Sequence, residues 1–177
     1  MTDAPSPAVF LDRDGTIMKD CDYCSDPKKV RIFPGVREAL LRLKSRGLKL
    51  IIITNQSGIG RGLMTLEQYR AVEAEVLRQL DWLIDATYFC TDVPGQHSSC
   101  RKPTPGMILQ AKREHAIDLS RSCFIGDKET DVECGRNACV RTIRVQTGFQ
   151  HDATASKADW MATDLPAAAE IILSTAP

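Results

Sequence analysis

The chain carries no excess of charge of either sign. Its 177 residues include 23 Lys and Arg and 23 Asp and Glu, for a formal net charge of +0 at pH 7. Proteins that bind nucleic acid or an anionic membrane through their overall charge are basic. The balance therefore supports neither partner, and we expect no nucleic acid and no membrane.

Long apolar runs are also missing. No stretch approaches the ~20 apolar residues that a membrane-spanning helix needs. The N-terminal MTDAPSPAVF contains neither the basic segment nor the apolar core of a signal peptide. We therefore expect a cytoplasmic protein, in which the seven cysteines are reduced.

Internal repeats, low-complexity tracts and linker-like segments are absent as well. A chain of this length suits one domain, and an apolar content of 43% is enough for an ordinary core. We expect a single domain over residues 1–177, with residues 1–7 disordered, that acts as a monomer.

The sequence does have a regular alternation of strand-like and helix-like segments. Apolar runs with strand character occupy residues 9–11, 48–55, 85–90, 121–127 and 140–145. Helical patterns occupy residues 34–47, 127–138 and 164–173, and two more begin at the capping box of Thr65 and Gln68 and at Thr104-Pro105. This alternation predicts an α/β fold, a Rossmann-like doubly wound parallel sheet with helices on both faces.

Polar residues follow four of the predicted strands. They are Asp12 and Asp14 within VFLDRDGTI, Thr54 and Asn55, Arg101 and Lys102, and Asp127 and Lys128 with Asp131 one turn later. The carboxyl ends of parallel strands meet at one edge, so these side chains should converge. Three carboxylates gathered there need a cation, and hard oxygen ligands suit Mg²⁺. An EF-hand is excluded, because the glycine stands fourth in the loop and not sixth.

Each motif alone also has a purely structural explanation. A DxDG sequence forms ordinary turns, TNQSG could be a capped turn, and RKP could be a solvated loop. Their occurrence in chain order, each at a strand end, favours a functional site.

Together the motifs resemble the haloacid dehalogenase (HAD) superfamily of phosphotransferases. The DxDGT, TN, Lys and GDxxxD elements correspond to residues 12–16, 54–55, 102 and 126–131. More closely, FLDRDGT, TNQSGIGRG, CRKPTPGM and GDK are similar to the D-glycero-D-manno-heptose-1,7-bisphosphate phosphatases and their histidinol-phosphatase relatives. The resemblance runs from Val9 to about Gly148. It implies a HAD-like hydrolase that removes the 7-phosphate of this sugar bisphosphate, in carbohydrate metabolism on the route to lipopolysaccharide precursors.

The resemblance also implies roles for the residues. Asp12 would be the nucleophile that forms an aspartyl-phosphate, and Asp14 would act first as acid and then as base. Mg²⁺ would be held by the carboxylates of Asp12 and Asp127 and the backbone carbonyl of Asp14. The phosphoryl oxygens would be held by Thr54, Asn55 and Lys102, with Lys128 and Asp131 at the edge of the metal site, where Asp131 could orient Lys102 or a water on the metal.

Substrate specificity is expected to come from loops. The stretches 16–50 and 56–101 leave room for one helix each, so the resemblance predicts a capless enzyme in which loops 18–31, 57–64 and 91–101 select the substrate. Arg61 and Arg101 are candidates for binding a second phosphate or a carboxylate. For Arg61, a solvated loop arginine is an equally open interpretation.

The relatives usually carry a structural zinc in the last of these loops, bound by Cys-x-His and Cys-x-Cys-Arg-Lys. Here Cys90 and Cys100 match, whereas Asp92 and Ser98 stand where a histidine and a cysteine would be. A site of Cys90, Asp92, His97 and Cys100 is conceivable, but two thiols without clear further ligands favour no zinc. The CxxC of Cys21 and Cys24 is interpreted as a chance spacing, with a metal or redox pair as the alternative.

Three other functions stay open. A histidinol-phosphate phosphatase would share the same motifs. A polynucleotide 3′-phosphatase would share DxDGT and the TNQ-like turn, but it would need a basic track for its substrate, which the sequence lacks. A phosphate- or metal-binding module without turnover would need a lost catalytic residue, and none is missing.

Overall fold

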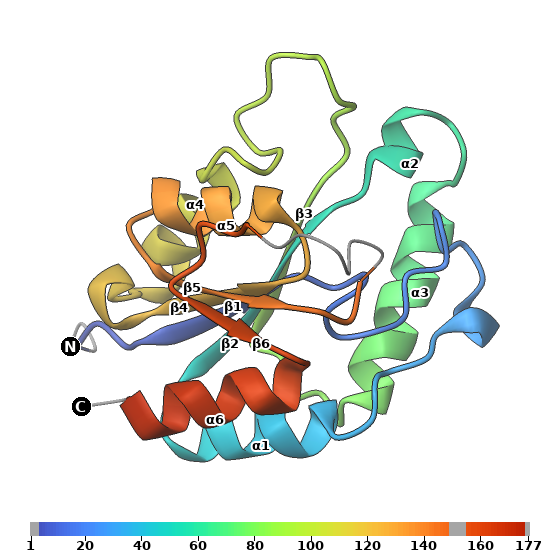
Figure 1. The fold of residues 1–177 in the computed structure, drawn as a ribbon. Coiled ribbons are helices and arrows are strands. Elements are labelled where there is room, and N and C mark those ends of the chain that lie inside the picture. The colour runs from blue at the N-terminus through green and yellow to red at the C-terminus, as the bar shows by residue number, and fades with distance from the viewer. Residues whose placement is uncertain (1–3, 149–154, 176–177) are drawn as a thin grey trace.

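The computed structural model describes residues 4–148 and 155–175. Its six strands form one parallel sheet in the order β3-β2-β1-β4-β5-β6 (Figure 1). The strands are β1 (Ala8–Leu11), β2 (Lys49–Asn55), β3 (Ala86–Cys90), β4 (Cys123–Gly126), β5 (Arg141–Val145) and β6 (Trp160–Ala162). The direction of winding reverses between β1 and β4, and crevices for ligands form at such switch points.

Helices cover both faces of this sheet. They are α1 (Val36–Ser45), α2 (Ser57–Gly60), α3 (Leu66–Gln79), α4 (Gly106–His115), α5 (Glu129–Asn137) and α6 (Leu165–Thr175), with short 3₁₀ turns η1 (Pro27–Lys29) and η2 (Leu119–Arg121). Figure 1 shows α1 and α6 side by side on one face and α4 and α5 on the other. The predicted doubly wound α/β fold is confirmed, and the connections after β1 and β2 carry no cap domain.

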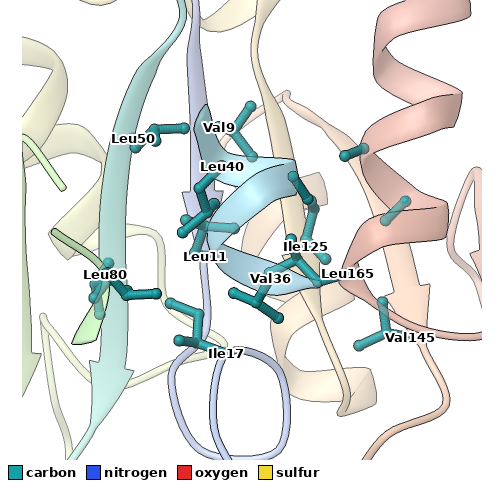
Figure 2. Close-up of a cluster of buried hydrophobic side chains, with 14 of the residues drawn as sticks. Val9, Leu11, Ile17, Val36, Leu40, Leu50, Leu80, Ile125, Val145 and Leu165 are labelled. Carbon is teal, nitrogen blue, oxygen red and sulfur yellow. The ribbon is translucent and has the colours of Figure 1, made fainter. Parts of the chain in front are cut away.

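The alternation of side chains along each strand divides the core in two. Val9 and Leu11 of β1 belong to the cluster beneath α1, α3 and α6, whereas Phe10 belongs to the cluster beneath α4 and α5. In Figure 2, Leu40 of α1 lies beside Leu11 of β1, and Val36 lies between β1 and Ile125 of β4. Both faces of β1 are therefore buried among apolar side chains, which explains its unbroken apolar sequence.

Local signals set the starts of the helices. The capping box of α3 forms as predicted: Gln68 N donates to Thr65 Oγ1 at 3.1 Å, and Thr65 N donates to Gln68 Oε1 at 2.8 Å. Pro105 precedes α4 as its N-cap and not as its first residue. Among the described residues, no helix has the length and apolarity to cross a membrane.

The structure corrects the sequence analysis in two places. Ser6 N donates to the Ala116 carbonyl and Lys49 N donates to the Pro7 carbonyl, both at 3.0 Å. Disorder was therefore the wrong prediction for Ser6 and Pro7, whose backbone groups pair at the edge of β1, while residues 1–3 lie outside the described part. The elements α2 and β6 were not predicted, because four and three residues are too short for a periodic pattern.

Two neighbouring leucines of α1 test which face of the helix the core needs. Leu40 is completely buried, whereas Leu41 is 50% exposed. We expect Leu40→Ala to lower the free energy of unfolding by about 2–5 kcal/mol, because it removes contacts in the larger core cluster. Leu41→Ala is the matched control and should change it by less than about 1 kcal/mol. Urea denaturation of both variants measures the difference, and equal losses would contradict the assigned face.

Candidate active site

The polar residues that follow the strands line a cavity of about 380 Å³. Its walls include eight of the predicted site residues: Asp12, Asp14, Thr54, Asn55, Arg101, Lys102, Lys128 and Asp131. Asp127 is 2% exposed and does not belong to the wall. The cavity opens where β1, β2 and β4 end, so the strand order alone brings together residues that lie far apart in sequence.

The Lys102 ammonium lies between two buried carboxylates. Its Nζ is 2.5 Å from Asp12 Oδ1 and 2.7 Å from Asp131 Oδ1, and it donates to the Ile53 carbonyl at 2.9 Å. Burial alone would lower the pKa of Lys102, but the two carboxylates outweigh it and raise that pKa. For Asp12, burial acts in the opposite direction and raises the pKa to about 6, although the charge of Lys102 lowers it. At neutral pH the pair is therefore ionic.

The backbone of Lys102 is held by a strand end. Asn55, the last residue of β2, accepts from Lys102 N at 3.0 Å and donates to the Lys102 carbonyl at 3.2 Å. The side-chain amide thus pairs with the peptide as a neighbouring strand would. Asn55 was predicted to contact the phosphoryl group, and this pairing adds a positioning contact that the sequence did not indicate.

Asp14 lies on another side of the cavity, in a different set of bonds. Arg13 donates to it through Nε and Nη2, both at 3.1 Å, and Gln56 Nε2 donates to Asp14 Oδ2 at 2.9 Å. Gln56 Nε2 also donates to Thr54 Oγ1 at 2.8 Å. Because the Thr54 oxygen accepts from Gln56, its own hydroxyl hydrogen is left to donate to a ligand. Gln56 therefore links the expected acid to an expected phosphoryl-binding group.

The carboxylate of Asp127 is buried in surroundings that suit a cation. Within the described residues, both of its carboxylate oxygens are buried and have no hydrogen-bond partner. Ligand atoms of Asp12, Asp127 and Asp131 all lie within 4.8 Å of one another. Burial, and then the neighbouring carboxylates, raise the pKa of Asp127 to about 8. Such a donor set is unfavourable alone and fits a hard divalent cation such as Mg²⁺.

The glycine of the DRDGT motif makes this arrangement possible. Gly15 has a φ of +93°, and a Cβ at its position would lie 2.5 Å from Asp127 Oδ2. Any other residue would therefore push the Asp127 carboxylate away from the end of β1. The close approach of the two loops depends on this missing side chain.

The rim of the cavity carries both signs of charge. Arg101 donates to the Asp92 carbonyl at 2.9 Å, and Lys128 Nζ is 3.6 Å from Asp20 Oδ2. Burial and the nearby Arg61 lower the pKa of Arg101. Two guanidinium groups that repel each other favour an anion between or beside them, although Arg61 is exposed and does not line the cavity.

Two residues of the conceivable zinc site are bonded to each other. Cys90 and Cys100 form a disulfide, with their Cα atoms 5.6 Å apart, so the prediction that all cysteines are reduced is wrong for this pair. Among the described residues only Asp92 completes a possible ligand group with them, and His97 is exposed outside it. Ser98 Oγ instead accepts from the backbone N–H of Cys100 and Arg101. The serine thus orders the turn at the position where the resemblance predicted a cysteine.

Unlike Cys90 and Cys100, the two cysteines of the CxxC spacing, Cys21 and Cys24, are free thiols. Burial, and then the adjacent Cys21 thiol, raise the pKa of Cys24 to about 11. A thiol that stays protonated at neutral pH is a poor metal ligand and a poor nucleophile.

Comparisons with known proteins agree with this geometry. A model of the HAD-hydrolase-like family matches residues 99–169. The D-glycero-β-D-manno-heptose-1,7-bisphosphate 7-phosphatase of Helicobacter pylori (strain J99) is 44% identical, over 76% of this chain and 79% of the relative. The chain belongs to the heptose bisphosphate phosphatase family of the HAD superfamily. A member from Thermosynechococcus vestitus, the D-glycero-D-manno-heptose-1,7-bisphosphate 7-phosphatase, is 36% identical over 95% of this chain and 96% of its own.

A solved structure extends the likeness to the fold of this family. The crystal structure of D,D-heptose 1,7-bisphosphate phosphatase from B. bronchiseptica, complexed with magnesium and phosphate, has a TM-score of 0.87 and 30% identity, and the match covers 96% of this chain and 99% of that one. This chain is accordingly a phosphatase. The alternative of a binding module without turnover is set aside.

Arg13, Gln56 and Glu73 are among the residues around the cavity that the sequence did not predict. Arg13 and Gln56 stand inside the motifs DRD and TNQS, but nothing in those motifs shows where their side chains point. Glu73 lies in the middle of α3 and contacts Arg13. For Glu73 the sequence offers no signal other than an acidic residue four positions after Tyr69, a common spacing on helices.

Removing the charge of Asp127 should reveal the cost of the uncompensated carboxylate. We expect Asp127→Asn to raise the free energy of unfolding of the metal-free protein at pH 8, by on the order of 1 kcal/mol or more, because no buried carboxylate is left without a partner. The same variant should lose most of the stabilisation that Mg²⁺ gives the wild type. Thermal unfolding with EDTA and with Mg²⁺ measures both effects. The exposed Asp81→Asn is the control, and a Mg²⁺ response equal in Asp127→Asn and wild type would contradict the assigned metal site.

The cysteine loop gives a second test. We expect purified protein to contain far less than one zinc per chain by elemental analysis. Mass spectrometry of peptides prepared without reductant should find Cys90 linked to Cys100. Stoichiometric zinc together with alkylated, free Cys90 and Cys100 would overturn the assignment.

Proposed function

We propose that this phosphatase removes the 7-phosphate of D-glycero-D-manno-heptose 1,7-bisphosphate, with Mg²⁺, through an aspartyl-phosphate on Asp12. The observation that carries the proposal is the 2.5 Å contact between the buried Asp12 carboxylate and the Lys102 ammonium, beside the Asp127 carboxylate, which has no hydrogen-bond partner among the described residues. The substrate is inferred from the names of the relatives, and the open cavity has room for it.

In the first step, an Asp12 carboxylate oxygen attacks phosphorus and the bond from phosphorus to the sugar oxygen breaks. The electron pair leaves with that oxygen, which takes a proton from Asp14 and departs as the alcohol. The hydroxyl of Thr54 and the ammonium of Lys102 donate to the phosphoryl oxygens, whose charge grows toward the transition state.

In the second step, water attacks the phosphorus of the aspartyl-phosphate. Asp14, now ionised, accepts the proton of that water. The bond between phosphorus and the Asp12 oxygen breaks, and inorganic phosphate and the original carboxylate are restored. The net reaction is ester plus water giving alcohol plus phosphate.

Charge balance supports a metal in this site. The phosphoryl group brings roughly −1.5 to −2 at pH 7, and the carboxylates of Asp12 and Asp127 add two further negative charges. Bound Mg²⁺, held by Asp12, Asp127 and the Asp14 carbonyl, would supply the positive charge that lets an anionic nucleophile approach an anionic phosphate. Lys102, Lys128 and Arg101, set against the further negative charge of Asp131, bring the assembled site close to neutral.

The second phosphate of the substrate explains the cations at the rim. Arg101 and Lys128 line the outer cavity, and Arg61 lies close enough to lower the pKa of Arg101. A bisphosphate would place its distal phosphate among them. Histidinol phosphate remains a second candidate, because the carboxylates of Asp20 and Asp22 also line the cavity and could bind its amine.

Phosphate release from three substrates tests the proposal. Heptose 1,7-bisphosphate should be hydrolysed with the highest kcat/KM, ahead of histidinol phosphate and a 3′-phosphorylated oligonucleotide. Asp12→Asn should lower turnover by at least roughly 10³-fold with an unchanged fold, and Asp81→Asn should leave it unchanged. Normal turnover by Asp12→Asn would refute the nucleophile, whereas preference for another substrate would refute only the specificity.

A further inference from the structure

The residue between the two catalytic aspartates is a buried arginine. Arg13 is 1% exposed, and its guanidinium carbon lies 5.3 Å from the centre of the Tyr69 ring. One edge of the guanidinium faces Asp14, with Nη2 2.9 Å from Asp14 Oδ2. The opposite edge faces Glu73, with Nη1 3.5 Å from Glu73 Oε2. Arg13 is thus shared between a site carboxylate and a carboxylate of helix α3.

Glu73 is itself fixed from two directions. Thr87 of β3 donates to Glu73 Oε1 at 2.6 Å, and the Tyr69 hydroxyl donates to Glu73 Oε2 at 3.4 Å. Helix α3 and strand β3 therefore hold the carboxylate that holds Arg13. The chain of contacts runs from the edge strand of the sheet to Asp14 and is separate from the contacts of Lys102.

We propose that Glu73 is a positioning residue for Asp14, acting through Arg13. The proposal rests on the acid and base roles proposed above for Asp14. With Glu73 in place, the charge of Arg13 is divided between two carboxylates, and the guanidinium plane is anchored to α3. Without the charge of Glu73, Arg13 keeps one carboxylate partner and its contact with Tyr69, but its attachment to α3 is weaker, so the Asp14 carboxylate is held in an altered orientation.

The alternative explanation is that this network only stabilises the fold, as a buried ion pair. Buried ion pairs are weak evidence for stability, because desolvation offsets most of their attraction. The two explanations differ in what they predict for the reaction. A loss of fold would affect every substrate and step, whereas a misplaced Asp14 affects only steps that transfer a proton.

Leaving-group dependence separates the two. The sugar alcohol of a heptose phosphate leaves only with a proton, whereas 4-nitrophenolate leaves without one. We expect Glu73→Gln to slow enzyme phosphorylation by heptose bisphosphate about 10- to 100-fold and to leave phosphorylation by 4-nitrophenyl phosphate within about threefold of wild type. Because hydrolysis of the aspartyl-phosphate also needs Asp14, 4-nitrophenolate should appear in a burst approaching one per chain, followed by a slow steady rate. Stopped-flow absorbance and quenched-flow phosphate assays measure these steps.

Matched variants make the result specific. Glu75 lies on the same helix, and its carboxylate binds Arg78 and Gln79. Glu75→Gln should therefore behave as wild type. Thr87→Val removes the donor to Glu73 without changing the size of the side chain, and it should show the Glu73→Gln pattern at smaller amplitude. Thr87→Val carries the test if Glu73→Gln fails to fold in thermal unfolding.

Asp14→Asn separates the two proposals. It should show the burst pattern more strongly than Glu73→Gln. Equal slowing of phosphorylation by both substrates in Asp14→Asn would refute the role of Asp14 and the inference with it. If Asp14→Asn shows the burst pattern, the role of Asp14 stands. If Glu73→Gln and Thr87→Val then show no effect, or slow phosphorylation by both substrates equally, only the inference about Glu73 is refuted.

Discussion

The ammonium of Lys102, buried between Asp12 and Asp131, is the interaction on which the rest of the site depends. The positive charge of Lys102 favours the ionised form of the buried Asp12 carboxylate at neutral pH. A carboxylate must be ionised to act as a nucleophile. Lys102 also fixes where the loop after β3 must run, because the lysine reaches the end of β1 only if its backbone lies against β2. Asn55 secures that path through two hydrogen bonds to the Lys102 peptide.

The site divides into two electrostatic halves that share little besides the β1 loop. One half contains Lys102, Asp131 and Asp127, where negative charge exceeds positive charge until a cation binds. The other half contains Arg13, Asp14 and Glu73, where an arginine already balances the carboxylates. The proposed nucleophile, Asp12, belongs to the first half, and the proposed acid, Asp14, belongs to the second. Two aspartates separated by one residue can thus do different work, because successive side chains of the loop enter different surroundings.

Much of this arrangement could be predicted from the sequence, for an identifiable reason. Asp12, Thr54 and Asp127 directly follow apolar runs that only a buried parallel strand explains, so their convergence follows from the strand order. Glu73 could not be predicted, because its contact with Arg13 depends on how α3 packs, and no local pattern records a packing angle. The Cys90–Cys100 disulfide was missed because the expected compartment argued for thiols, whereas the disulfide depends on the close return of a loop.

The way in which Asn55 holds Lys102 has a consequence for how such enzymes can diversify. The segment between β3 and Lys102 projects from the body of the molecule (Figure 1), and both of its ends are held by β2, through strand pairing at one end and through the Asn55 side chain at the other. The residues between these ends can change in length and composition while the lysine keeps its place. In this chain a disulfide and a serine-ordered turn close that loop. Substrate preference can drift there over evolutionary time while the hydrolytic machinery stays constant.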